Sequence, residues 1–560
     1  MRPVRLLNME LRSRFGGLPN WRSLMRSDAD RWATARQRAD GPKVLIATSV
    51  GSHLIANTLD STLAVALTLR QARVHGFLCD RVLPACLSCE MDWWPDHDHF
   101  VAHGPTRTLC RPCYEPAAAM WRDMGLTLQT LGRFVTPAER EAFCKLANDL
   151  PEAELDAHEH LGVRVGMHAR SGTLRYFARG TLDGEPDADP VRRRYLAAAL
   201  IATTAIDRLF EAERYDVCVA HHGIYVPQGL IVELARKHDT RIVTWNIAYR
   251  AGSFIFSHDD TYHFTLMTEP VDAWSSLGWD GRLQSALDDY MTARRTGAKD
   301  WISYQEGSQQ ELDTLSAEHG IDFAKPTVAA FTNVLWDAQV FYRSNAFPSM
   351  LDWIVETIRY FARRPDLQLV VRVHPAEIKN PLRTRQKLVD ELARAFPELP
   401  ENVFVIPPES PAGSYAIAAA ANAAIIYGTK MGVELSYMGI PTIVAGESWA
   451  RNKGLTLDAD SREAYFELLD RLPLAEGLDD ATRKQAAKYA FHFFFRRTIP
   501  LDFLSVQRGA WPPFKLKLDS LAPLLPGADP GLDLICEGIL EGAPFVYPAE
   551  TLIQDGKLSH

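Results

Sequence analysis

YGTKMGVELSYMGIPTIVAGE, residues 427–447, places a helix-like segment between two strand-like segments and has a glycine near each boundary. The apolar strand ANAAIIYG (421–428) leads into it, and PTIVAG (441–446) has the composition of the next strand. Gly439 can end the helix before that second strand starts. A strand, a short helix and another strand within so few residues are typical of a buried parallel sheet, so the stretch predicts an α/β fold.

The alternation of strands and helices continues on the N-terminal side of this stretch. Further strands are expected at residues 327–332, 367–375 and 402–408, with helices at 350–363 and 383–395.

A separate series begins nearer the N-terminus with KVLIATSVGSH, in which Gly51 lets the chain turn between a strand and a helix. Its expected elements are strands at 43–48, at the apolar run VHGFLC (74–79), at 217–220 and at 241–245, with helices at 54–69 and 228–237.

These two series predict two Rossmann-like α/β domains that face a central cleft. The expected boundaries are an arginine-rich N-terminal extension at 1–40, a first domain at 41–320, a second domain at 325–480, and a crossing helix and tail at 481–560.

Composition excludes several classes of protein. The chain has 560 residues, of which 47% are hydrophobic and 23% charged, so it can fill two cores. Its net charge of −9 does not favour nucleic-acid binding, which needs a basic face. No apolar run approaches the ~20 residues of a membrane span. We therefore expect a cytoplasmic protein.

The N-terminal extension differs from the rest in charge. Residues 1–40 contain nine arginines and four acidic residues, interspersed with apolar ones. Such a segment either contacts the inner membrane peripherally, through anionic lipid, or packs as a helix on its own protein.

Five of the eight cysteines lie between Cys79 and Cys113. Two C-x-x-C pairs, Cys86 with Cys89 and Cys110 with Cys113, have the spacing of a four-thiolate metal site in a loop inserted at residues 80–115. The first choice of metal is structural Zn²⁺, and a 4Fe-4S cluster is the alternative. Cys79 is an additional ligand, a redox partner or a core residue.

The helix start inside the opening stretch is a candidate phosphate site. Unpaired amides at Thr429–Gly432 would face the carboxyl edge of the sheet, with Tyr427 and Gly428 before them. Lys430 adds a positive charge. Glu434, one turn further, either accepts hydrogen bonds from sugar or ribose hydroxyls or only complements the helix dipole.

A second group of polar residues stands at other strand ends of the same half. Arg372 and His374 in VVRVHPAE would project from one side of a strand end, where they suit diphosphate oxygens. Asn452 and Lys453 follow the last strand, in GESWARNKG. We predict that these residues also bind the donor.

The N-terminal half offers proton acceptors and polar groups at its own strand ends. His221 and His222 in VAHHGIYVPQG are the best candidates for a catalytic base, and Asp60 is the second choice. The candidate acceptor-binding residues are Gly51, Ser52 and Asn57, together with Trp245, Asn246, Tyr249 and Arg250. His53 lies in the same turn as Gly51 and Ser52.

At these positions the sequence resembles bacterial capsular and surface polysaccharide glycosyltransferases of the GT-B fold, including the capsule-synthesis type related to Kdo transferases. The matching motifs are R-x-H-P at Arg372 to Pro375 and G-T-(x4)-E-(x4)-G-I-P from Gly428 to Pro441, within residues 327–455. The resemblance implies a nucleotide-sugar donor in the C-terminal domain, a glycan or lipid-linked acceptor in the N-terminal domain, and no catalytic metal. The cysteine loop departs from the family pattern.

Two other functions are compatible with these motifs. A nucleotide-sugar epimerase of the same fold would use the same glycine and glutamate helix without an acceptor. A metal-stapled scaffold with a decayed transferase site would bind donor without turnover.

Overall fold

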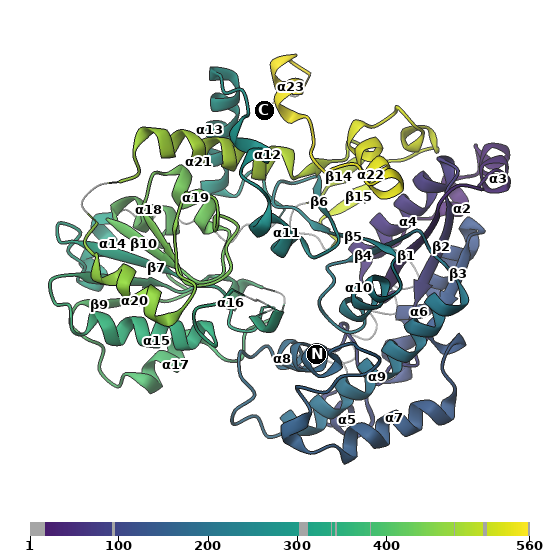
Figure 1. Cartoon of the computed structure of the whole chain (residues 1–560), viewed down its shortest axis with the longest axis horizontal. Coiled ribbons are helices and arrows are strands. Elements are labelled where there is room, and N and C mark those ends of the chain that lie inside the picture. Colours follow the sequence, from purple (N-terminus) through teal and green to yellow (C-terminus); the bar gives the residue numbers. More distant parts are fainter. Residues whose placement is uncertain are drawn as a thin grey trace. The chain divides into compact units, whose positions relative to one another are not determined.

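The computed structural model describes residues 17–91, 96–301, 312–337, 339–341, 344–380, 382–474, 477–507 and 512–557. Figure 1 shows their helices and strands. Residues 1–16 of the predicted arginine-rich extension lie outside the described residues.

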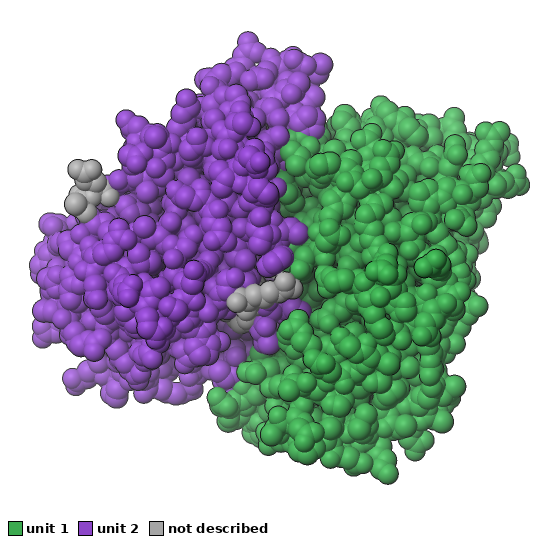
Figure 2. All heavy atoms as spheres, in the orientation of Figure 1, with its two compact units in different colours: residues 1–177, 182–262, 497–547 green, residues 178–181, 263–496, 548–560 purple. Residues whose placement is uncertain are grey.

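The chain divides into two compact units, which Figure 2 colours separately. Unit 1 comprises residues 1–177, 182–262 and 497–547, and unit 2 comprises residues 178–181, 263–496 and 548–560. Residues 263–320, assigned from the sequence to the first domain, therefore group with unit 2.

Unit 1 is built on a seven-stranded sheet in the order β13-β6-β5-β4-β1-β2-β3. The five strands from β3 to β5 are parallel, and β6 and β13 are antiparallel to their neighbours. The strands are β1 Lys43–Ser49, β2 Arg73–Leu78, β3 Thr127–Thr130, β4 Val217–His221, β5 Arg241–Ile247, β6 Ser253–His258 and β13 Ile499–Pro500. β1 and β4 pair directly. The strands β2 and β3 follow on the side of β1, and β5 follows on the side of β4, so the boundary between β1 and β4 is the switch point of the sheet.

Apolar strands and amphipathic helices explain the core of unit 1. Leu45 and Ala47 on β1 pack in one cluster with Leu230 and Leu234 of the neighbouring helix α10. The helices of this unit are α2 Trp21–Leu24, α3 Ala29–Gln37, α4 Leu54–Leu69, α5 His97–His103, α6 Arg107–Met124, α7 Pro137–Asp149, α8 Val165–Phe177, α9 Ala188–Ala212, α10 Gln228–Lys237 and α22 Pro530–Glu541. Short elements complete it: η1 Leu131–Arg133, η2 Glu152–Glu154, η5 Ala522–Leu524 and the hairpin β14 Leu504–Val506 with β15 Phe514–Leu516.

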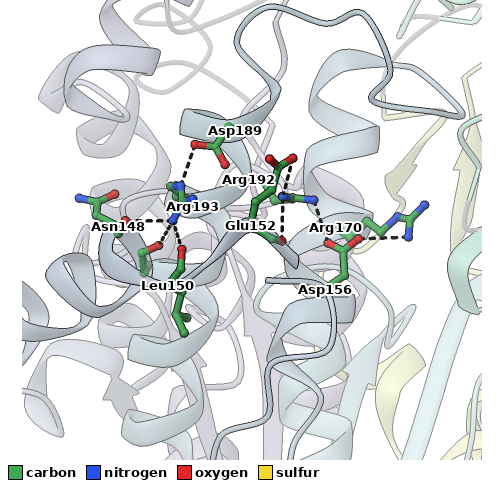
Figure 3. A network of polar contacts seen from close by, with 9 residues as sticks. Asn148, Leu150, Glu152, Asp156, Arg170, Asp189, Arg192 and Arg193 are labelled. Atoms are coloured by element: carbon green, nitrogen blue, oxygen red, sulfur yellow. Dashed lines mark hydrogen bonds and ion pairs between the residues drawn. The ribbon is translucent and has the colours of Figure 1, made fainter. Parts of the chain in front are cut away.

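Arginines of α9 bind the end of α7 and the segment after it (Figure 3). Arg193 donates hydrogen bonds to the carbonyls of Ala147, Asn148 and Leu150 at 2.8–3.0 Å, and its Nε lies 2.7 Å from Asp189 Oδ2. A cation at the last carbonyls of a helix satisfies acceptors that the helix leaves unpaired. Arg192 forms an ion pair with Asp156, whose Oδ1 lies 3.4 Å from Arg192 Nη1.

Unit 2 is built on a six-stranded parallel sheet in the order β12-β11-β10-β7-β8-β9. The strands are β7 Thr327–Phe331, β8 Gln368–Arg372, β9 Val403–Ile406, β10 Ala423–Ile426, β11 Thr442–Val444 and β12 Leu457–Asp458. Its switch point lies between β7 and β10. The predicted α/β class with parallel sheets is thus confirmed in both units.

The helices of unit 2 connect these strands and extend beyond them. They are α11 Tyr262–Thr268 (which starts at the boundary with unit 1), α12 Asp272–Ser275, α13 Gly281–Thr296, α14 Leu312–His319, α15 Met350–Phe361, α16 Ala376–Lys379, α17 Leu388–Ala395, α18 Ser414–Ala420, α19 Met431–Tyr437, α20 Arg462–Asp470, α21 Asp480–Phe491 and α23 Ala549–Gln554. A 3₁₀ turn, η3, covers Gln339–Phe341, and a π-helical turn, η4, covers His492–Arg496. Across the described ranges, no helix combines the length and apolar character needed to span a bilayer.

Candidate functional sites at the two sheet switch points

Four loops meet at the carboxyl edge of the unit 2 sheet. Asn333, after β7, donates from Nδ2 to the carbonyl of Gly428, after β10, at 3.2 Å. The N–H of His374, after β8, donates to Thr332 Oγ1 at 3.2 Å, and Ser448, after β11, donates from Oγ to the Thr429 carbonyl at 3.0 Å. Ligands of open α/β sheets bind at such an edge, beside the switch point. The structure therefore brings Gly428, Thr429 and His374 into one group of loops.

Gly432 fits α19 against these loops. A Cβ at this position would lie 2.6 Å from Ser448 Oγ and 2.9 Å from Ile426 Cδ1, so a larger residue would push the helix start away from β10 and from the loop after β11. The helix itself has only seven residues, so its dipole is small and nearby cations matter more for binding an anion.

A buried ion network lies directly behind Lys430. Glu434 is 1% exposed, and its Oε1 lies 2.6 Å from Arg294 Nη2 and 3.4 Å from Lys430 Nζ. Arg294, on α13, also binds Asp300 Oδ2 through Nη1 at 2.7 Å. Burial alone would raise the pKa of Glu434, but the cations Lys430 and Arg294 outweigh it and lower that pKa. The carboxylate predicted to meet sugar hydroxyls is thus charged and bound to protein cations.

Arg372 and His374 are held by backbone groups. Arg372 donates from Nη1 to the Pro407 carbonyl at 2.5 Å and from Nη2 to the Ser410 carbonyl at 3.1 Å, while its buried Nε has no hydrogen-bond partner among the described residues. Burial lowers the pKa of Arg372 to about 10. Burial, followed by the charges of Lys430 and Arg372, lowers the pKa of His374 to about 3, so the imidazole is neutral.

Three predicted donor residues have other contacts. The Tyr427 ring lies in the core, and its hydroxyl donates to the Phe347 carbonyl at 2.7 Å. Lys453 is 4% exposed and donates to the carbonyls of Met267 and Glu269 at 3.0 and 2.5 Å. Asn452 is exposed, with a left-handed backbone (φ 61°), and its N–H donates to Asp458 at 2.8 Å. Their predicted role in donor binding stays a prediction.

In unit 1, three imidazoles gather at the switch point between β1 and β4. The ring centroids of His53, after β1, and His221, at the end of β4, are 4.5 Å apart, and those of His221 and His222 are 5.8 Å apart. Burial is the largest cause that lowers the pKa of all three, to about 4 for His53 and His222 and well below its usual value for His221. At pH 7 these rings are neutral and can accept a proton.

The backbone at the end of β4 is strained where these histidines stand. His222 has φ 61° and the following Gly223 has φ 77°. A left-handed conformation costs about 1 kcal/mol or more in a residue other than glycine. The His222 N–H donates to the Trp245 carbonyl at 2.9 Å, which fixes the turn.

Two predicted residues of the α4 region support the turn from within. The side-chain amide of Asn57, which is fully buried, donates to the carbonyls of Val50, Gly51 and His53 at 3.0–3.2 Å. Asp60 is also fully buried, accepts a 2.9 Å hydrogen bond from Trp245 Nε1, and has its pKa raised by burial to about 7. Both side chains are fully buried, and their predicted roles in acceptor binding and catalysis stay predictions.

The β5–β6 region gives the remaining predicted acceptor residues different environments. Trp245 is fully buried between His221 and the aromatic rings of β6. Asn246, Tyr249 and Arg250 are half-buried, and Asn246 Oδ1 accepts from the next backbone N–H at 2.8 Å. Their binding roles remain predictions.

The cysteine pairs come together around the turn after β1. Cys113 Sγ accepts from the Ser52 N–H at 3.2 Å, and Ser52 Oγ lies 2.5 Å from the hydroxyl of Ser88, between Cys86 and Cys89. Burial, followed by the charge of Cys86, raises the pKa of Cys79 to about 12 and that of Cys113 to about 11.

The predicted metal centre is not supported. Within the described ranges, no group of three or more His, Cys, Asp or Glu side chains is placed to hold a metal ion. Cys110 and Cys113 lie within the helix α6 and not in a loop, which the predicted metal site assumed. Cys86, Cys89, Cys110 and Cys113 are all free cysteines.

Sequence reasoning missed several residues of these sites. Thr332 and Asn333 directly follow β7, and Ser448 lies in the loop after β11, so the expectation that strand-end loops carry site residues could have found them. Arg294 and Asp300 lie in a polar helical region without a motif, 134 or more residues before Glu434. Only the folded chain shows that Arg294 binds both Glu434 and Asp300.

No protein-family model matches this chain, and no curated protein matches it. Among solved structures, it is similar to the Thermosulfurimonas dismutans KpsC β-Kdo 2,4 transferase (15% identity, TM-score 0.33, 49% of this chain and 79% of that chain covered). It is also similar to a putative UDP-N-acetylglucosamine 2-epimerase from Listeria monocytogenes (11%, TM-score 0.24, 80% and 94%). A third is the spinosyn rhamnosyltransferase SpnG (12%, TM-score 0.24, 81% and 96%). These likenesses are weak, and none identifies the family of the chain.

Proposed function

We propose that the chain is a glycosyltransferase that moves a sugar from a nucleotide-sugar donor to a glycan or lipid-linked acceptor in surface polysaccharide biosynthesis. The observation that carries this proposal is the meeting of four strand-end loops at the switch point of unit 2, with the Lys430 ammonium beside them. This is where an open parallel sheet binds a nucleotide.

Donor binding in unit 2 would use backbone amides and cations. The Lys430 side chain is 31% exposed, so its ammonium can reach a diphosphate from its place next to Thr429. During transfer, the bond between the anomeric carbon and the diphosphate oxygen breaks and negative charge develops on the leaving group. A cation fixed at that point lowers the energy of the transition state.

Acceptor activation would use unit 1. A neutral imidazole at His222 or His221 takes the proton of the acceptor hydroxyl as its oxygen bonds to the anomeric carbon. His222 is the better placed of the two, because it is half-buried whereas His221 is 5% exposed.

A ligand screen tests the donor site. The thermal unfolding midpoint is measured with UDP, GDP, CMP, CDP and dTDP sugars, because a ligand that binds only the folded state raises it. We expect one nucleotide class to raise it, and Lys430→Met to reduce that shift strongly. Lys325→Met, an exposed lysine of unit 2 before β7, should keep the full shift.

The outcome separates the candidate functions. Release of nucleoside diphosphate that depends on an added glycan acceptor supports a transferase, whereas epimer formation without acceptor supports an epimerase. Failure of all five nucleotide classes to shift the midpoint would refute the proposed donor site.

A further inference from the structure

A polar network of unit 2, formed by residues of α13 and α19 and by Asp300 after α13, is almost fully buried. The side chains of Arg294 and Glu434 are 2% and 1% exposed, and that of Asp300 is 8% exposed. Tyr290 donates its hydroxyl hydrogen to Asp300 Oδ1 at 2.9 Å and accepts from Arg294 Nη1 at 3.1 Å. The guanidinium also lies 4.7 Å from the centre of the Phe494 ring.

The charges of this network balance only when Lys430 is included. Arg294 and Lys430 are cations, and Asp300 and Glu434 are carboxylates. Arg294 gives Glu434 the two shorter contacts, at 2.9 and 2.6 Å, while Lys430 stands at 3.4 Å from the same oxygen. A buried carboxylate that lost its main partner would draw the remaining cation toward itself, because an unpaired buried charge is costly.

We propose that Arg294 is a positioning residue of the nucleotide-sugar site: by binding Glu434, it leaves the Lys430 ammonium able to turn outward to the diphosphate of the donor. Glu434 then acts through Lys430 and makes no contact with the sugar or ribose. Asp300 and Tyr290 hold the guanidinium in place. The inference rests on the proposed function, since it assumes that unit 2 binds a diphosphate.

Two probes distinguish this positioning role from a direct contact between Glu434 and the ribose or sugar. Inorganic diphosphate has no ribose or sugar, and the nucleoside diphosphate selected by the ligand screen has a ribose. Binding of both is measured by calorimetry on the full chain. We expect Arg294→Met to weaken both probes roughly tenfold or more, because Lys430 turns to Glu434. We expect Glu434→Gln to leave both bound at least as tightly as in the wild type.

A triple variant is the decisive measurement. Arg294→Met with Glu434→Gln and Asp300→Asn removes both buried carboxylates of the network together with their partner, so neither can draw Lys430 inward, and we expect binding of both probes to return to within about threefold of the wild type. Arg295→Met, the exposed neighbour on α13, is the matched control. Circular dichroism and the unfolding midpoint establish that each variant is folded.

Three outcomes would overturn the inference. Weak binding that persists in the triple variant would mean that Arg294 acts only on folding. A loss confined to the nucleoside diphosphate in Glu434→Gln would mean that Glu434 contacts the ribose. Unchanged binding in Arg294→Met would mean that the network does not affect the site. A wild-type chain that binds neither probe refutes the proposed function instead.

Discussion

Asp60 shows how a single buried carboxyl can govern the pH dependence of unit 1. Its folded-state pKa is about 7, against about 3.8 in the unfolded chain, because burial disfavours the charged form. Between these values the folded state binds more protons than the unfolded state, so raising the pH from 4 to 7 lowers the free energy of unfolding. The effect is at most about 4 kcal/mol, since each pKa unit corresponds to about 1.4 kcal/mol.

Asp60→Asn should remove this dependence. The amide oxygen can still accept from Trp245 Nε1, but the group cannot ionise. We expect the variant to gain stability relative to the wild type at pH 8, and this gain to disappear near pH 4. Urea unfolding at both pH values measures the difference. Asp149→Asn, at an exposed position on α7, should show no such change. An equal effect of Asp60→Asn at both pH values would contradict the assignment.

Residue positions at the sheet edges could be predicted from the sequence, whereas the roles of these residues stay predictions. Because residues that follow a parallel strand lie at the carboxyl edge of the sheet, the sequence predicts that His221, His222, His374 and Thr429 lie at sheet edges. The structure has them there. The sequence could not distinguish a side chain that faces a ligand from one that supports the loop, as Asn57 does with three backbone carbonyls. That distinction depends on burial and on contacts between segments distant in sequence, which a single sequence does not reveal.

At the scale of elements, the turn between β1 and α4 depends on Gly51. A Cβ there would lie 1.8 Å from the carbonyl oxygen of Cys113 on α6. Gly51→Ala should therefore separate the turn from α6, destabilise the protein by about 1–3 kcal/mol, and expose Cys113 to thiol reagents. Denaturant unfolding and the rate of thiol modification check both effects. Gly278→Ala has no atom within 4 Å of its Cβ and serves as the control. Equal stability of the two variants would refute the close approach.

The periodic elements were predictable and the irregular ones were not. The helices at 54–69 and 228–237 have the predicted bounds, because an apolar helical pattern follows a turn in each case. The strand β3 was missed, since TLQT lies at the sheet edge with only one buried residue and has no apolar run. The π-helical turn η4 buries His492 and three consecutive phenylalanines, which is not an amphipathic helical pattern.

At the scale of the whole molecule, the chain order of the two units could not be predicted in full. Both sheets were expected from repeated strand and helix patterns. A crossing helix and tail were expected at 481–560, but no motif predicts that residues 497–547 join unit 1, because this depends on β13 pairing with β6 and on α22 packing against β4 and α4. Such contacts are set by tertiary packing and not by local propensity.

Arg241 joins this late segment to the first sheet. At the start of β5, its guanidinium donates to the carbonyls of Gly538, Ile539 and Leu540 at 2.7–3.0 Å, at the end of α22. Charge-assisted hydrogen bonds to helix-end carbonyls are each worth about 1.5–3 kcal/mol, and they fail together when the guanidinium is removed. Arg241→Met should therefore loosen α22 from unit 1 and increase cleavage by a non-specific protease within residues 497–547. Mass spectrometry of the fragments measures the rate and place of cleavage, and Arg214→Met, an exposed arginine two residues before Asp216, is the control. If both variants were cut at the wild-type rate, the segment would be held by its apolar contacts and not by Arg241.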